Sequence, residues 1–176
     1  MLKQPNLLIV AGTGRNSGKT TLACKIISQS DQYNIVAVKI SPHRHDPVPT
    51  SVLIHSGKGF EIFLEKVYGE YKDTERMLSA GAAKAYYIQA VDNAVIEAFR
   101  RLLSLIPEGE PIICESPVLR KFIEPSLFII TDSRSVQNRK ETTGLEELAD
   151  LKVSYEERQT GPGIISFADG RWFINR

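Results

Sequence analysis

Several features that would narrow the function of this chain are scarce or missing from its sequence. The chain has two cysteines, Cys24 and Cys114, and both fall within apolar patterns, so we expect reduced core residues rather than a disulfide or a metal pair. The longest apolar runs are strand length, short of the ~20 residues that cross a bilayer. No signal-peptide pattern opens the sequence, which predicts a cytoplasmic protein without a membrane partner.

The charge of the chain is nearly balanced. Lysine and arginine number 22 and aspartate and glutamate number 21, which gives a net charge of +1. No basic run or arginine-rich tail is present, so the charge does not favour a nucleic-acid partner. The apolar fraction is 42% and the charged fraction 24%, as in ordinary globular proteins. A length of 176 residues predicts a single domain over 1–176.

Short apolar runs alternate with helical patterns along the chain. The runs predict strands at 6–11, 35–40, 85–88, 111–115 and 126–131. Nearly all-apolar strands are typical of a parallel sheet that is covered on both faces. We therefore expect an α/β fold in three layers, with a mostly parallel central sheet and helices on both of its faces.

Two β-hairpins are predicted in addition to this alternation. In 51–65, two apolar runs flank the turn Ser56-Gly57-Lys58-Gly59, and in 163–174 alternating runs flank Asp169-Gly170. The second hairpin contains Trp172, the only tryptophan, which we expect to anchor it by packing rather than to bind a ligand. We interpret the first hairpin as an insertion and the second as a C-terminal addition to the α/β fold.

The strand at 6–11 runs directly into a glycine-rich turn and then into a helix. The turn and the start of the helix comprise Gly12, Thr13, Gly14, Arg15, Asn16, Ser17, Gly18, Lys19, Thr20 and Thr21. Strand, glycine-rich turn, Gly-Lys-Thr and helix, in that order, are the layout of a phosphate-binding P-loop, or Walker A motif. In such a loop, backbone N–H groups and the positive end of the helix hold phosphates. Lys19 is the candidate for a catalytic contact with the β- and γ-phosphates, and the Thr20 hydroxyl for a Mg²⁺ ligand.

The spacing of this loop departs from the standard motif. The standard motif has four residues between its first glycine and the Gly-Lys pair, and that count places Thr13 where the glycine belongs. Gly12 lies one residue farther away. The loop is therefore predicted to be either a variant with five intervening residues or one that uses Gly14 in its turn.

Further candidate residues follow other predicted strands. Lys39 lies near the carboxyl end of its strand, where open α/β sheets bind ligands, so it is either a γ-phosphate or substrate contact or a solvent-facing lysine. His43 and His45, in a proline-rich loop, are candidates to contact phosphate, position water or ligate a metal, and Asp46 is a catalytic candidate that reaches Mg²⁺ through water. Glu115 ends a buried strand, where P-loop proteins carry the carboxylate that holds Mg²⁺, although it could instead cap a helix.

Three segments carry a family resemblance. They are Gly18-Lys19-Thr20-Thr21-Leu22, Val36-Ala37-Val38-Lys39 with the histidine-bearing loop and Asp46, and Lys72-Asp73-Thr74-Glu75-Arg76 leading to Ala80-Gly81-Ala82. In them the chain resembles MobB-type P-loop proteins, which are adapters in molybdopterin guanine dinucleotide biosynthesis. The resemblance implies a GTP-binding protein of low hydrolytic activity, often a homodimer, that partners enzymes of molybdenum cofactor biosynthesis.

The chain departs from that family at one further point and also lacks a motif that many GTPases use. It has Glu115-Ser116 where the family has Glu-Gly, and it lacks an Asn-Lys-x-Asp segment of the kind that selects guanine. The sequence therefore predicts a Mg²⁺-dependent protein that binds GTP or ATP and hydrolyses it slowly.

Two alternative functions stay open. The Gly12-Thr13 start and the five-residue spacing are similar to the loop of dethiobiotin-synthetase-like ATP-dependent ligases, in which case Lys39 would bind an acyl phosphate or the substrate. A small-molecule kinase belongs to the same alternative. In the other, nucleotide binding would only switch a partner-binding surface formed by the hairpin at 51–65, without catalysis.

Overall fold

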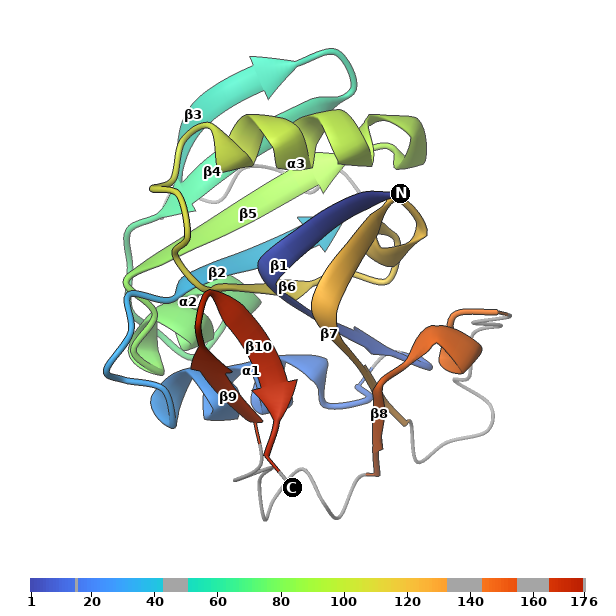
Figure 1. The fold of residues 1–176 in the computed structure, drawn as a ribbon. Helices are drawn as coiled ribbons and strands as arrows, with labels where there is room; N and C mark the ends of the chain where they lie inside the picture. The colour runs from blue at the N-terminus through green and yellow to red at the C-terminus, as the bar shows by residue number, and fades with distance from the viewer. Residues whose placement is uncertain (15, 43–50, 133–143, 155–164, 176) are drawn as a thin grey trace.

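The structure is a computed structural model that describes residues 1–14, 16–42, 51–132, 144–154 and 165–175. These residues form an α/β fold around a mixed, mostly parallel sheet of eight strands (Figure 1). The strands are β1 (Leu2–Gly12), β2 (Val36–Ser41), β3 (Ser51–Gly57), β4 (Phe60–Glu65), β5 (Lys84–Ala90), β6 (Ile112–Glu115), β7 (Ile123–Thr131) and β8 (Leu151–Val153). The expected α/β class and the mostly parallel sheet are confirmed.

The order of the strands brings several of the predicted site residues that the structure describes to one edge of the sheet. The order is β3-β4-β5-β2-β6-β1-β7-β8. The strands β5, β2, β6, β1, β7 and β8 run parallel to one another. Glu115 is in register with Val10 of β1 and with Lys39 of β2. Thr131 of β7 is in register with Gly12. The ends of β1, β2, β6 and β7 therefore lie side by side.

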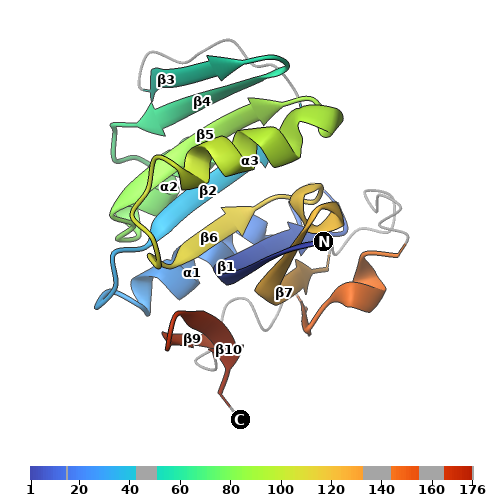
Figure 2. The same cartoon turned by 45° about the horizontal axis from the view of Figure 1, so that its top comes forward.

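Helices pack on the two faces of the sheet (Figure 2). α1 (Lys19–Ser28) and α2 (Asp73–Ser79) cover one face, and α3 (Val95–Leu103) covers the other. Short 3₁₀ turns lie at η1 (Asp92–Ala94), η2 (Leu119–Lys121) and η4 (Glu146–Leu148). Within the described ranges, no helix has the length and the apolar character needed to cross a membrane.

Strand β1 is held by core packing on both sides. Its side chains alternate: Leu7 and Ile9 belong to the apolar cluster under α3, whereas Leu8 and Val10 belong to the cluster under α1 and α2. All four are fully buried. Burying each such side chain contributes roughly 1.5–3 kcal/mol relative to exposure. The strand that leads into the glycine-rich loop is therefore a rigid support.

The hairpin of β3 and β4 extends the central sheet. The two strands pair antiparallel around a turn in which Gly59 has a positive φ of 83°. β4 also pairs antiparallel with β5, so β3 is the outermost strand on that side. The predicted hairpin at 51–65 is therefore an edge of the main sheet.

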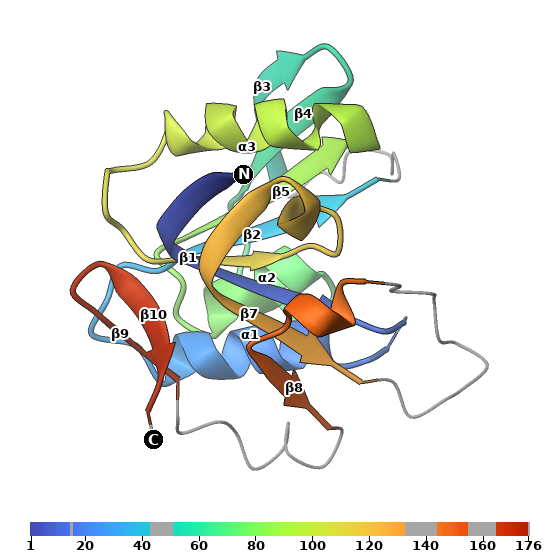
Figure 3. The ribbon, with the colours of Figure 1, turned by 45° about the vertical axis from the view of Figure 1, so that its right-hand side comes forward.

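A second hairpin lies beside α1 (Figure 3). β9 (Ile165–Ala168) and β10 (Arg171–Ile174) pair antiparallel, and the turn residues Asp169 and Gly170 have φ of 50° and 71°. Positive φ at both positions is the geometry that favours Asp-Gly in tight hairpins. Trp172 is 1% exposed, and its indole N–H donates to the Asn6 carbonyl at 3.1 Å. Trp172 thus anchors the hairpin, as its sequence pattern predicts.

Candidate functional site

The glycine-rich turn begins on β1 and ends at the first residue of α1. Gly18, the N-cap of α1, has a φ of 82°, and Asn16 has a φ of 56°. Glycine adopts this left-handed conformation without steric cost, and asparagine tolerates it better than most residues. These two positions give the chain the curvature it needs to enter the helix at Lys19.

Gly12 is required because the loop closes directly against it. A Cβ at this position would lie 2.0 Å from Ser17 Oγ, 2.7 Å from Thr131 Oγ1 and 2.9 Å from Lys19 Cγ. Ser17 is completely buried, and its hydroxyl lies within hydrogen-bond distance of Thr131 Oγ1, at 3.0 Å. The loop therefore packs on a glycine that five residues separate from Gly18, and strand β7 lies behind it.

Thr13 attaches the loop to the end of β7. Its backbone N–H donates to the Thr131 carbonyl at 3.1 Å, and its hydroxyl donates to Asp132 Oδ1 at 2.9 Å. The Thr13 residue is 1% exposed. In the standard motif this position is a glycine. Here it is a buried threonine, and both hydrogen bonds hold it at the end of β7.

The Lys19 ammonium group lies within the loop. Lys19 Nζ donates to the Gly14 carbonyl at 2.9 Å and to Ser17 Oγ at 3.2 Å. A lysine at this position brings a positive charge to the mouth of the turn. Together with the positive end of the α1 dipole, this charge makes the turn favourable for an anion.

Thr20 lies between two carboxylates. Its Oγ1 is 2.8 Å from Asp73 Oδ1 and 2.7 Å from Glu115 Oε2, so its single proton can be donated to either of them. Lys39 Nζ donates to Glu115 Oε1 and forms an ion pair with Asp73 Oδ2 at 2.9 Å. One hydroxyl, one ammonium group and two carboxylates therefore form a compact cluster at the start of α1.

The charges in this cluster stabilise one another. Burial alone would lower the pKa of Lys39, but attraction to Glu115 and Asp73 outweighs burial and raises it above the ordinary 10.5. Burial alone would raise the pKa of Asp73, but Lys39 and the Thr20 hydroxyl lower it below the ordinary 3.8. Both groups are therefore charged at neutral pH, although the Lys39 side chain is only 20% exposed.

A cavity of about 460 Å³ opens over this cluster. Its lining residues are Asn16, Gly18, Lys19, Thr20, Thr21, Lys39, Asp73, Arg76 and Glu115. Arg76 extends from α2 and donates through Nη2 to Thr21 Oγ1 at 3.2 Å. The cavity thus has cationic groups from three elements and carboxylates from two.

A second cavity, of about 270 Å³, lies next to the Thr13 end of the loop. It is lined by Thr13, Ile130, Asp132, Glu146, Lys152, Val153 and Ser154. Ile130 and Val153 give it an apolar wall, and Asp132, Glu146 and Lys152 give it charged groups. Thr13 lines this cavity and belongs to the same turn as the residues that line the first.

The structure brings together several of the predicted site residues. Lys19, Thr20, Lys39 and Glu115 line one cavity, and Glu115 contacts Thr20 and Lys39 rather than capping a helix. Four predicted residues lie outside the described part of the chain, namely Arg15, His43, His45 and Asp46.

Two residues of the cavity were not predicted as site residues. Asp73 is the first residue of α2, whose N-cap is Lys72, and its carboxylate contacts the Thr20 hydroxyl. Arg76 lies one turn farther along α2. The sequence signal that could have identified them is residues 72–76, which carry part of the family resemblance. The resemblance did not assign a role to either residue.

The oxygen atoms around Thr20 are the type that a hard divalent cation prefers. Among the described residues, no group of three or more His, Cys, Asp or Glu side chains could hold a metal ion. The set at Thr20 instead combines one hydroxyl with two carboxylates. Mg²⁺ is commonly held by one or two carboxylates, with water and substrate phosphates completing its coordination. The donor set therefore fits Mg²⁺ that arrives with a phosphate ligand.

Comparisons with protein-family models, with curated protein sequences and with solved structures found no match to this chain. Its loop and Lys19 favour an anion, while Thr20, Asp73 and Glu115 favour a cation. The two preferences meet within one cavity, at the start of one helix.

Proposed function

We propose that the chain binds a nucleoside triphosphate, GTP or ATP, together with Mg²⁺, in a three-layer P-loop NTPase fold. The observation that carries this proposal is the placement of Lys19 and Thr20 at the start of α1. They follow a turn that closes on Gly12, and they face Lys39 and Glu115 at the ends of neighbouring strands. An anionic ligand with a bound metal ion suits this cavity, because the loop and Lys19 favour an anion while Thr20, Asp73 and Glu115 favour a cation.

In this proposal, the loop and Lys19 hold the phosphates. Backbone N–H groups of the turn and the positive end of α1 would face the β-phosphate, and the Lys19 ammonium group would contact the β- and γ-phosphates. To do so, Lys19 exchanges its contacts with the Gly14 carbonyl and Ser17 for phosphate oxygens. Arg76, which also lines the cavity, adds a further positive charge.

Thr20, Glu115 and Asp73 are the residues that would hold Mg²⁺. The ion, when bound, neutralises charge on the phosphates and favours transfer of the γ-phosphoryl group. Lys39 pairs with both carboxylates and is close enough to the cavity to contact the γ-phosphate or a second substrate. His43 and His45, and Asp46 as a catalytic residue, stay predictions for the same end of the cavity.

The second cavity is the proposed place for the base. It lies beside Thr13, and Ile130 and Val153 offer apolar surface while Asp132 and Glu146 offer hydrogen-bond acceptors. A carboxylate that accepts from N1–H and N2–H would favour guanine, whereas adenine has one amino group to donate. Direct comparison of GTP with ATP decides between them.

The biological role that we propose is an adapter in molybdenum cofactor biosynthesis, with slow nucleotide hydrolysis. The resemblance to MobB-type proteins supports it, and it implies a homodimer and an enzyme partner. Lys39 supports a second candidate, an ATP-dependent ligase or small-molecule kinase, because its ammonium group lies in the cavity beside both carboxylates. A nucleotide-controlled switch that uses the edge hairpin of β3 and β4 is the non-enzymatic alternative.

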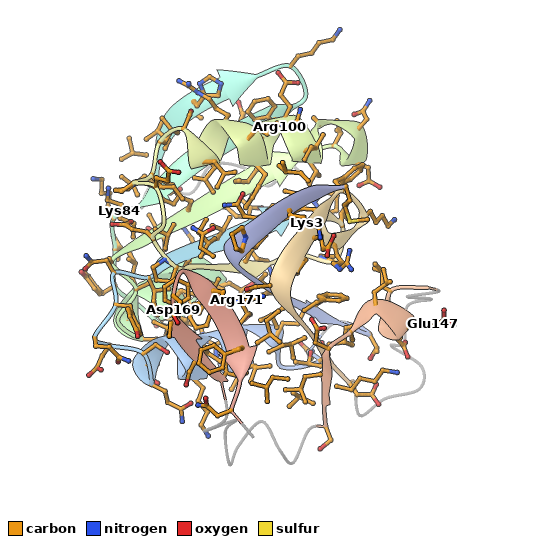
Figure 4. All side chains as sticks on the ribbon, in the orientation of Figure 1. Lys3, Lys84, Arg100, Glu147, Asp169 and Arg171 are labelled. Atoms are coloured by element: carbon orange, nitrogen blue, oxygen red, sulfur yellow. The ribbon has the colours of Figure 1, made fainter. Side chains whose placement is uncertain are left out.

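Calorimetric titration with GTP and ATP, in Mg²⁺ and in EDTA, tests the shared core of these proposals. We expect Lys19→Ala to weaken triphosphate binding on the order of 10- to 100-fold, because it removes a charge-assisted contact. Lys84→Ala is the matched control: Lys84 is exposed at the amino end of β5, the opposite edge of the sheet (Figure 4). Equal affinity of Lys19→Ala and the wild type, or no binding by the wild type, would overturn the proposal.

Hydrolysis assays then separate the candidate roles. Slow hydrolysis of GTP that no small molecule stimulates favours the adapter. A strong preference for ATP, with turnover stimulated by a small carboxylic acid, favours the ligase. Binding without any turnover favours the switch.

A further inference from the structure

The residues before α2 contain a buried carboxylate that does not line the cavity. Glu65, the last residue of β4, is 3% exposed. Its Oε1 accepts the backbone N–H groups of Lys66 at 3.0 Å and Val67 at 3.2 Å. Its Oε2 accepts the Thr74 hydroxyl at 3.0 Å. Burying a carboxylate is costly unless donors surround it, and these three donors fix where the chain leaves β4 and where α2 begins.

A second buried carboxylate braces the same segment. Glu75 is 4% exposed, and its Oε2 accepts the backbone N–H of Lys72 at 3.4 Å. A Cβ on Gly69 would lie 2.6 Å from this oxygen, so the segment packs closely on Glu75. The Ser79 hydroxyl donates to the Gly69 carbonyl at 3.1 Å. The segment is therefore tied to α2 at both ends of the helix.

Asp73 lies in the chain between Lys72, whose N–H donates to Glu75, and Thr74, whose hydroxyl donates to Glu65. Thr74 and Glu75 are buried and turn their polar groups to the segment before α2, whereas Asp73 turns its carboxylate to Thr20 and Lys39. α2 has only seven residues, and a helix this short is not stable by itself. The direction of the Asp73 side chain therefore depends on how the start of α2 is held.

We propose that Glu65 and Thr74 are positioning residues that act through Asp73. Their hydrogen bond holds the first turn of α2 so that the Asp73 carboxylate faces Thr20 and thereby sets the affinity for metal-bound nucleotide. This inference rests on the proposed function. If it is correct, Glu65 connects strand β4 through Thr74 to Asp73, one of the residues that would hold Mg²⁺.

Thr74→Val and Thr74→Ser form a matched pair for the test. Valine keeps the shape of threonine and removes the hydroxyl that donates to Glu65, whereas serine keeps that hydroxyl. With Mg²⁺ and a slowly hydrolysed GTP or ATP analogue, we expect Thr74→Val to weaken binding about 10- to 100-fold, as loss of an outer partner of a metal ligand does. In EDTA, Thr74→Val should match the wild type. Thr74→Ser should match it in both conditions.

The role of Asp73 is tested by a double-mutant cycle. If Thr74 acts through Asp73, Thr74→Val has no further effect on Mg²⁺-dependent affinity when Asp73 is already asparagine. The same fold-change in both backgrounds, or the same loss in EDTA as in Mg²⁺, would overturn the proposal, because each indicates general destabilisation.

Crystal structures of the wild type and Thr74→Val provide a readout without nucleotide. We expect the Asp73 carboxylate to leave Thr20 in the variant, and retention of the 2.8 Å contact would overturn the positioning role. If the wild type binds neither nucleotide, the proposed function fails. In that case, displacement of Asp73 in the variant still supports the positioning by Thr74, and an unmoved Asp73 refutes it.

Discussion

Replacing Lys39 with methionine removes a cation from between two carboxylates and keeps most of the side-chain volume. Glu115 is the decisive partner, because its side chain is 2% exposed whereas that of Asp73 is 37% exposed. Removing one member of a buried ion pair costs about 3–5 kcal/mol, since the other charge stays buried without it. Thr20 can still donate its hydroxyl proton to one of the two carboxylates in the variant. We therefore expect the lower end, about 3 kcal/mol.

Thermal and urea denaturation measure this change directly. For a domain of this size, each kcal/mol shifts Tm by about 2–4 °C, so the Tm of Lys39→Met should fall by about 6–12 °C. Adding Glu115→Gln to Lys39→Met should restore most of the loss, because a neutral amide needs no counter-charge. Lys3→Met is the control: Lys3 and Glu124 are 3.7 Å apart, with side chains 79% and 46% exposed, and the change should cost under about 0.5 kcal/mol.

The result that would refute this reasoning is equal stability of Lys39→Met and Lys3→Met. Such a result would mean that the buried Glu115 carboxylate does not depend on Lys39 for its stabilisation in the folded protein. A Lys39→Met/Glu115→Gln variant no more stable than Lys39→Met would also contradict it, because the cost would then arise from packing.

Three further predictions follow from the site and the core. Gly12→Ala should lower the free energy of unfolding by about 2 kcal/mol through overpacking, and adding Ser17→Ala should recover part of it in urea denaturation, because the nearest clash is with Ser17 Oγ at 2.0 Å; an unchanged Gly12→Ala variant contradicts the close approach. Because Lys39 and Thr20 lower the pKa of Asp73 despite its burial, the stability that this carboxylate adds is complete above its unfolded pKa and is lost as pH falls through the lower folded value. The difference in unfolding free energy between the wild type and Asp73→Asn should thus be constant from about pH 5 to 7 and narrow below about pH 4, and a difference that grows with acidity would contradict this. Trp172→Phe should lower Tm by about 4–8 °C, measured by circular dichroism, because it leaves the buried Asn6 carbonyl without its donor; an unchanged Tm would mean that the hairpin is not anchored there.

The parts of the fold that the sequence predicts correctly are those with strong local patterns. The apolar run before the loop predicts β1, and the Asp169-Gly170 turn predicts the second hairpin. Both features are determined by residues that are adjacent in the sequence. The prediction of 6–11 for the first strand is too short, since Leu2–Gln4 are polar or exposed and pair with β7 only through a register shift. β8 was not predicted, because three residues contain too little pattern to identify a strand.

Some residues of the candidate site could likewise be predicted from the sequence, and others could not. Lys39 and Glu115 could be predicted because parallel strands bring their ends to one edge, and the register then places the two residues side by side. Asp73 could not, because it is 53 residues from Thr20 and its direction depends on how Glu65 and Glu75 hold the segment before α2. A local pattern predicts only that an aspartate near a helix start is a cap. In the structure the N-cap of α2 is Lys72, and the Asp73 carboxylate contacts Thr20 instead.

The most direct test of nucleotide binding at this loop is a crystal structure of the chain grown with Mg²⁺ and a slowly hydrolysed GTP or ATP analogue. The proposal predicts β- and γ-phosphates within the turn from Gly12 to Gly18, in contact with Lys19, and a Mg²⁺ ion on Thr20 beside Glu115. Phosphates bound elsewhere on the molecule, or an empty turn at nucleotide concentrations that saturate the protein in solution, would contradict it.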